Sequence, residues 1–97
     1  MNEEIKAALD TYIAAEEVRW TEEEKYQAQR RRVAGFNTPG SEAQLMPNVD
    51  DLLAGVLAAE DNAFGARCAY MAACRETQHD DSLVDLHNAV LAARGSR

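Results

Sequence analysis

The sequence predicts an all-α protein of three main helices, and three observations support this prediction. Apolar residues recur at the three- and four-residue spacing of a helix over most of the 97-residue chain. The alternation and hairpin dipeptides that indicate strands do not occur in the sequence. Both prolines, Pro39 and Pro47, fall within residues 35–48, which we interpret as a linker inside a single domain spanning residues 1–97.

The first helix is expected over about residues 3–33. Asn2 is a favourable N-cap, and Glu3 and Glu4 suit the positive end of the helix dipole. An apolar stripe then follows one face and contains Ile5, Leu9, Tyr12, Ile13 and Trp20. After Trp20 the stripe ends, and Thr21 with Glu24 has the pattern of a capping box. The helix therefore either breaks near Thr21 or continues beyond the body of the domain.

The second helix is expected over about residues 49–78, with Asn48 as its cap, and it should be the central one. A short helical turn could precede it from Ser41. The helix is nearly apolar or small all round, which is typical of burial on more than one side. Its small face contains Gly55, Ala58, Ala59, Ala66 and Ala73. We expect this face to admit a helix from a second subunit, which predicts a homodimer or higher oligomer.

The third helix is expected over residues 82–94, with Ser82 and Asp85 as a capping box and Gly95 as its stop. His87 falls on its apolar face and is expected to be a core residue. Charged residues also interrupt the apolar faces of the other helices, and they are Glu16, Glu60 and Arg67. These three either lie at the rim of the core or form a buried or interfacial ion pair.

The net charge and the two cysteines of the chain indicate which partners and which cellular compartment suit it. The 17 acids against 10 bases give a net charge of -7, which disfavours direct binding of nucleic acid or anionic membranes. The sequence contains no apolar run of about 18 residues that could span a membrane. Cys68 and Cys74 lie about 120° apart around a helix and cannot bond to each other within it. Together with an acidic N-terminus, these features predict a reduced, cytoplasmic protein.

Residues 20–33, WTEEEKYQAQRRRV, reverse their charge from one end to the other. Acids at 22–24 and arginines at 30–32 suit the two ends of a helix dipole, and we favour this interpretation. In the alternative, Arg30, Arg31 and Arg32 hold an anion or a partner, because no acid stands three or four residues before them. Tyr26, one turn earlier, could stack under such a ligand.

The sequence offers no catalytic motif, such as a P-loop, GxGxxG or GxSxG. The one group of residues to consider for a metal is His79, Asp80, Asp81 and His87. These residues lack the spacing of a zinc site, and Asp81 and His87 lie far apart around any helix that contains both. We therefore expect no enzymatic activity, no metal and no cofactor.

The expected function is that of a non-enzymatic protein-binding module. The first 24 residues hold eight acids against two bases, dense enough to imitate a phosphate track. This favours a small acidic inhibitor or decoy, of the kind that viruses and mobile elements direct against a basic surface of host nucleic-acid-handling proteins. The expected contacts are Glu16, Glu17, Glu22, Glu23 and Glu24. The alternatives are a helical oligomeric assembly subunit and a small-ligand or nucleotide binder using Tyr26 and Arg30–Arg32.

Overall fold

The computed structural model describes residues 2–34 and 41–96 and contains three helices in chain order. They are α1 (Glu3–Ala34), α2 (Ser41–Glu76) and α3 (Ser82–Gly95), and no strand occurs among the described residues. The predicted all-α fold of three helices is therefore confirmed.

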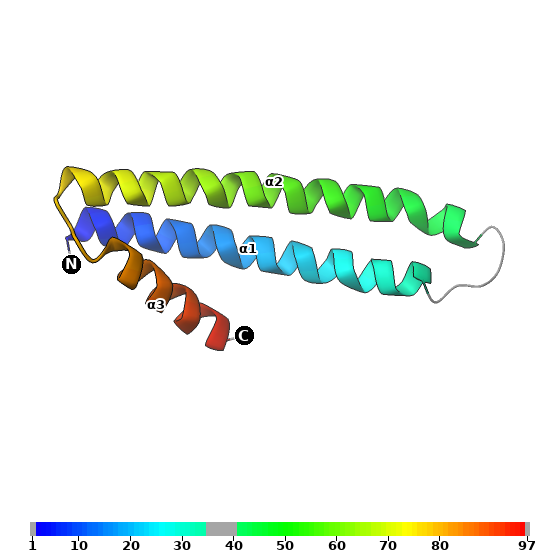
Figure 1. Ribbon diagram of the computed structural model, residues 1–97. Coiled ribbons are helices and arrows are strands. Elements are labelled where there is room, and N and C mark those ends of the chain that lie inside the picture. The colour runs from blue at the N-terminus through cyan, green and yellow to red at the C-terminus, as the bar shows by residue number, and fades with distance from the viewer. Residues whose placement is uncertain (1, 35–40, 97) are drawn as a thin grey trace.

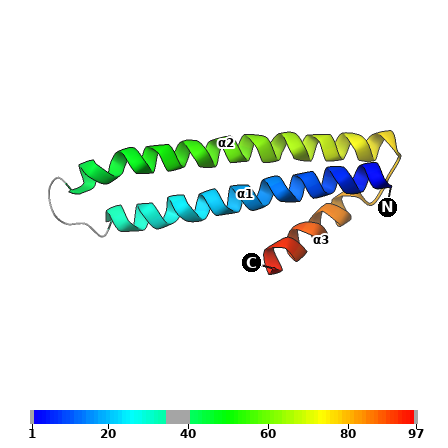
Figure 2. The same ribbon diagram turned by 180° about the vertical axis from the view of Figure 1, so that it is seen from behind.

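The first two helices form a long antiparallel hairpin, and α3 folds back from the end of α2 (Figure 1). Seen from behind, α3 runs obliquely away from the hairpin (Figure 2), and it packs on α1 more than on α2. The molecule measures 59 × 23 × 15 Å, with a radius of gyration of 17.7 Å. A compact domain of about 100 residues has a radius of about 13 Å, so this fold is elongated and exposes much helix surface.

The largest apolar cluster lies at the end of the bundle where all three helices meet. Its buried members are Ile5, Leu9, Tyr12, Tyr70, Cys74 and Leu86. Tyr70 is fully buried and donates a hydrogen bond of 2.9 Å from its hydroxyl to the backbone oxygen of Ser82. This bond satisfies the phenol inside the core and ties α2 to the first residue of α3.

The first helix is continuous through Thr21, so the suggested break does not occur. The hydroxyl of Thr21 donates back to the carbonyl oxygen of Glu17 at 3.0 Å, a bond that a threonine inside a helix can make. The predicted cap at the other end is confirmed, because the Glu4 amide donates to Asn2 Oδ1 at 2.8 Å. The hairpin is therefore long because α1 continues as a helix beyond Trp20, where its apolar stripe ends.

The second helix begins at Ser41, so the prediction of a start at Val49 after an Asn48 cap was wrong. Residues 41–48 of the expected linker are helical, and residues 35–40 lie outside the described part of the chain. Pro47 lacks an amide hydrogen and forgoes one helical bond, but cooperative bonding on either side carries the helix through it.

The second helix ends at Glu76, two residues before the predicted end, in a Schellman turn. The Gln78 amide donates to the Arg75 oxygen at 3.2 Å, and the His79 amide donates to the Cys74 oxygen at 2.9 Å. Gln78 has φ of 56°, the left-handed conformation that glycine adopts most easily. The sequence does not indicate this turn, because Gln78 stands at the position where glycine is usual.

The start of α3 does not use the predicted capping box. Asp81 is the N-cap residue and makes no side-chain capping bond, and Gly95 belongs to the last helical turn instead of following it. Asp85 instead contacts the His79 ring, with 2.6 Å between Asp85 Oδ2 and His79 Nε2. The N-terminus of α3 is therefore held by tertiary contacts from the end of α2 and the turn that follows it.

We expect Gln78→Gly to raise the free energy of unfolding by about 0.5–1 kcal/mol, because glycine reaches a positive φ without a clash of Cβ. Glu76→Gly is the matched control, since the same glycine inside the helical end should cost about 1 kcal/mol. Urea denaturation measures both variants. A Gln78→Gly protein that is less stable than wild type contradicts the assigned turn.

We also expect stability to fall at high pH because of Tyr70. Burial, chiefly, raises the pKa of the Tyr70 phenol far above its ordinary value, and the neighbouring Cys74 adds to the rise. The neutral phenol therefore stabilises the fold fully below about pH 10, and this contribution is lost as the pH rises further. Tyr70→Phe should cost about 1 kcal/mol at neutral pH through the lost bond to Ser82. The free energy of unfolding of Tyr70→Phe should also fall less steeply than that of wild type between about pH 9 and 12. Equal slopes for the two proteins contradict the assignment.

Candidate functional site

The middle of α1 is organised around Arg19, which is held between two glutamates of its own helix. Its Nη2 lies 2.6 Å from Glu16 Oε2, and its Nη1 lies 2.8 Å from Glu23 Oε1. Glu16 is only 6% exposed, and its hydrogen bond raises the pKa of the Arg19 guanidinium. Glu16 is therefore a buried carboxylate whose partner is Arg19, and neither Arg67 nor Glu60 makes the ion pair that we considered for them.

The five glutamates expected to contact a partner do not form one acidic face. Glu16 is buried, Glu23 is half-buried against Arg19, and Glu22 is half-buried with its Oε1 3.5 Å from Lys25 Nζ. Glu17 and Glu24 are exposed. The helix turns by about 100° per residue, so these neighbours in sequence point in different directions.

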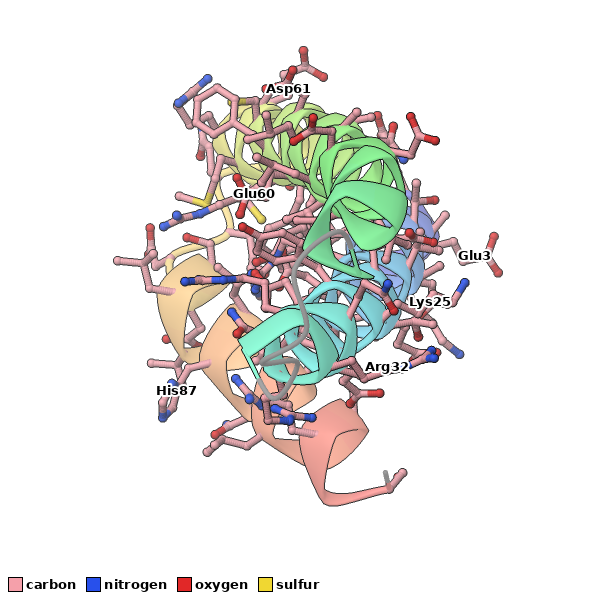
Figure 3. All side chains as sticks on the ribbon, turned by 90° about the vertical axis from the view of Figure 1, so that its right-hand side faces the viewer. Glu3, Lys25, Arg32, Glu60, Asp61 and His87 are labelled. Atoms are coloured by element: carbon pink, nitrogen blue, oxygen red, sulfur yellow. The ribbon has the colours of Figure 1, made fainter. Side chains whose placement is uncertain are left out.

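A different set of acids does share the outer side of α1. We call Glu3, Asp10, Glu17 and Glu24 the acidic row, and all four are exposed. They stand seven residues apart, so they follow one another at about 10.5 Å with a drift of about 20° per step. Figure 3 shows Glu3 projecting on the side of the bundle opposite His87. The seven-residue spacing is visible in the sequence, but the prediction followed adjacent glutamates, so it included Glu17 and Glu24 and left out Glu3 and Asp10.

Beside the acidic row lies a shallow depression of about 400 Å³ on α1, lined by Ala14, Glu17, Val18, Thr21 and Glu22. Val18 is 52% exposed, although the side chain is apolar. An apolar contact with an acidic border resembles the core and rim of a protein interface on a small scale. Lys6 and Lys25 also border the row, and Lys25 is already engaged with Glu22.

The three arginines of the QRRRV segment point in different directions and do not converge on one ligand. The guanidinium of Arg30 lies 5.7 Å from the centre of the Tyr26 ring. Arg30 therefore covers one face of this ring itself. Arg32 Nη1 donates to Gln29 Oε1 at 3.4 Å, and Arg31 lines a separate open hollow. Arg31 and Arg32 stand in the last turn of α1, where the helix dipole favours positive charge. This arrangement supports helix-end chemistry over an anion site for Tyr26 and the arginines.

The hollow lined by Arg31 has a volume of about 450 Å³ and lies between α1 and Arg94 near the C-terminal end of α3. Its lining also includes Trp20 and Arg94, with the Arg94 guanidinium 5.2 Å from the centre of the Trp20 ring. A stacked cation and indole here fasten the end of α3 to the middle of α1. This pairing could not be predicted from the sequence, because no sequence pattern sets the angle of α3.

The small face of α2 is packed mainly against α1 of the same chain. Ala59 and Ala73 are buried, and Ala66 packs on the apolar cluster. A Cβ at Gly55 would come within 3.0 Å of Glu22 Oε2 on α1. Of the five residues expected to contact a second subunit, Ala58 alone is exposed. The small residues therefore allow α1 to approach, and they do not leave a free oligomer face.

His87 is exposed, so the expectation of a core histidine was wrong. Because α3 packs mainly on α1, the side of α3 that carries His87 stays in solvent (Figure 3). No group of three or more His, Cys, Asp or Glu side chains converges for a metal within the part of the chain that the structure describes. Both cysteines are free, with Cys68 exposed and Cys74 buried.

No protein-family model, curated protein or solved structure matches this chain. None of the helices, over their described residues, is both long enough and apolar enough to cross a membrane. The candidate site therefore rests on the geometry of the helices themselves.

We expect Arg19→Gln to destabilise the fold by about 1–2 kcal/mol, because it leaves the buried Glu16 carboxylate without its charged partner. Glu16→Gln should cost less, since the amide keeps an acceptor for Arg19 and removes the buried charge. Lys25→Gln is the control at an exposed pair and should cost at most about 0.5 kcal/mol. Thermal melts measure all three, and equal melting temperatures for Arg19→Gln and Lys25→Gln contradict the assignment.

Proposed function

We propose that this protein is a non-enzymatic binding module that docks on a basic protein surface through the outer side of α1. The contact surface is the acidic row, Glu3, Asp10, Glu17 and Glu24, together with the depression around Val18. In its more specific form, the protein is an inhibitor or decoy that occupies the phosphate-binding surface of a nucleic-acid-handling protein.

The observation that carries this proposal is an exposed apolar side chain beside a row of exposed acids. Val18 is 52% exposed and shares its depression with Glu17, a member of the row. Four carboxylates at steps of about 10.5 Å cover about 31 Å of one helix, which is the scale of a small protein interface. Charges of one sign along such a line attract a basic surface from a distance and speed association.

The acidic row also fits the charge of the whole chain. A net charge of -7 repels nucleic acid itself but favours the proteins that bind nucleic acid, because their surfaces are basic. The row belongs to the straight, continuous part of α1, so its spacing is fixed before a partner arrives. A rigid carboxylate array of this kind could exclude a phosphate backbone by competing for the same arginines and lysines.

We expect neutralising the row to abolish partner binding and leave the fold intact. The test variant carries Glu3→Gln, Asp10→Asn, Glu17→Gln and Glu24→Gln. The matched control carries Asp51→Asn, Asp61→Asn, Glu76→Gln and Asp80→Asn, which remove the same charge from exposed positions elsewhere. Immobilised wild type, test and control proteins are incubated with the nucleic-acid-binding proteins of a nuclease-treated lysate, at low salt and at about 0.5 M salt.

The proposal predicts a protein that wild type and control retain at low salt, that the test variant loses, and that high salt releases. Val18→Ser should weaken the same complex, since it removes the apolar contact without changing charge. The purified partner should then lose its nucleic acid when wild type is added. Equal retention by the test and control variants contradicts the proposal, because binding would then follow total charge and not the row.

The second candidate, a helical assembly subunit, is favoured by large apolar side chains on the outside of α2. Leu57 is 54% exposed and Phe64 is 68% exposed. These residues lie on a different helix from the acidic row, so the two roles need not exclude each other.

A further inference from the structure

The outer side of α2 carries an exposed apolar stripe, which we call the α2 stripe and define as Leu53, Leu57, Phe64, Cys68 and Met71. The first three are 37%, 54% and 68% exposed, Cys68 is exposed, and Met71 is half-buried. At about 100° per residue, the five positions fall within an arc of about 60°. Soluble monomers seldom expose large apolar side chains in a continuous line, so the α2 stripe indicates an interface.

Two opposite charges stand on one edge of the α2 stripe. Glu60 and Arg67 are both exposed, and both line a groove of about 230 Å³ with Phe64 and with Tyr12 of α1. They are seven residues apart, so they lie within about 20° of each other around the helix, with Phe64 between them along it. Among the described residues, neither makes an ion pair.

We propose that a second copy of this chain packs antiparallel on the α2 stripe, with the two-fold axis beside Phe64. This inference does not rest on the function proposed for α1. An antiparallel two-fold relation places residues at equal distances before and after Phe64 opposite each other. Leu57 of one copy then meets Met71 of the other, and Phe64 meets its own symmetry mate.

The same relation pairs the charges. A two-fold axis of this kind keeps each edge of the α2 stripe on its own side, so Glu60 of one copy comes within one residue of facing Arg67 of the other. Two equivalent ion pairs result, one at each side of the axis. A parallel two-fold arrangement would instead place the two charged edges on opposite sides of the interface, so Glu60 of one copy would not meet Arg67 of the other. The order of charges therefore selects a second copy in the antiparallel direction as the occupant.

The size of the α2 stripe sets the expected strength of the dimer. Residues 49–76 of α2 span about 42 Å, and a contact about 10 Å wide buries on the order of 800 Å² over both copies. Stable interfaces bury at least about 1,000 Å². Exposed Leu83 and Leu91 on α3 can supply more, because Glu60 and His87 project on the same side of the bundle (Figure 3). The dimer should accordingly have a dissociation constant in the micromolar range.

Charge reversal tests the pairing in the full chain. Sedimentation equilibrium from about 1 to 200 µM should show a reversible dimer for wild type. Glu60→Arg and Arg67→Glu should each weaken it by roughly 10- to 100-fold, because each sets two like charges together. An equimolar mixture of the two variants should associate again, since both pairs in the mixed dimer are attractive. Asp61→Arg on the opposite edge is the control and should dimerise like wild type, and circular dichroism checks that each variant is folded.

A cross-link tests the position of the axis independently of charge. In a Cys68→Ser background, Phe64→Cys should form an intermolecular disulfide under mild oxidation. The wild-type Cys68 should not, because the two copies of Cys68 then stand about 12 Å apart along the helices. The proposal is overturned by a wild-type protein that is monomeric at about 200 µM. It is overturned equally by single reversals that still dimerise, or by a mixture that does not associate.

Discussion

The structure depends on one constraint, the close approach of α1 to the small side of α2. Ala59, Ala73 and Gly55 allow this approach, and a Cβ at Gly55 would already meet Glu22 of α1 at 3.0 Å. Helices that pack through small residues can lie near the lower end of the usual axial separation of about 8–10 Å. The rotation of α2 that buries Ala59 and Ala73 together with Tyr70 also turns Leu57 and Phe64 outward.

Both proposed surfaces follow from this arrangement. The hairpin is thin, because α3 covers only part of α1, so the outer sides of both long helices meet solvent. On α1 the outer side is acidic, with Val18 as its one large exposed apolar side chain among the described residues. On α2 the outer side is apolar, with Glu60 and Arg67 on one edge. One chain thus exposes a charged surface on α1 and an apolar surface on α2.

The sequence predicted the number and type of the helices, because caps such as Asn2 and the 3.6-residue periodicity are local signals. It failed at Pro47, where a residue that often ends a helix is carried by the cooperativity of a long one. At Thr21 it left a break or a continuation open, and the helix continues. The prediction also assigned the small face of α2 to a second subunit, whereas Ala59 and Ala73 of that face are buried within the single chain. Both sides are apolar, so periodicity cannot choose between them, and tertiary packing decides. The acidic row could have been found from its seven-residue spacing, but the burial of Glu16 beside Arg19 could not.

The rotation of α2 about its own axis is the central claim, and the two native cysteines report it directly. Cys68 is exposed and Cys74 is 2% exposed on the same helix. The measurement is the rate of alkylation of each thiol in the folded wild-type protein at about 1 µM, where the proposed dimer is dissociated, with the labelled peptides identified by mass spectrometry. Cys68 should react at the rate of a free thiol, and Cys74 at least about 10³-fold more slowly, because it becomes accessible only when the core opens. Comparable rates, or a protected Cys68 beside a reactive Cys74, would contradict this rotation of α2.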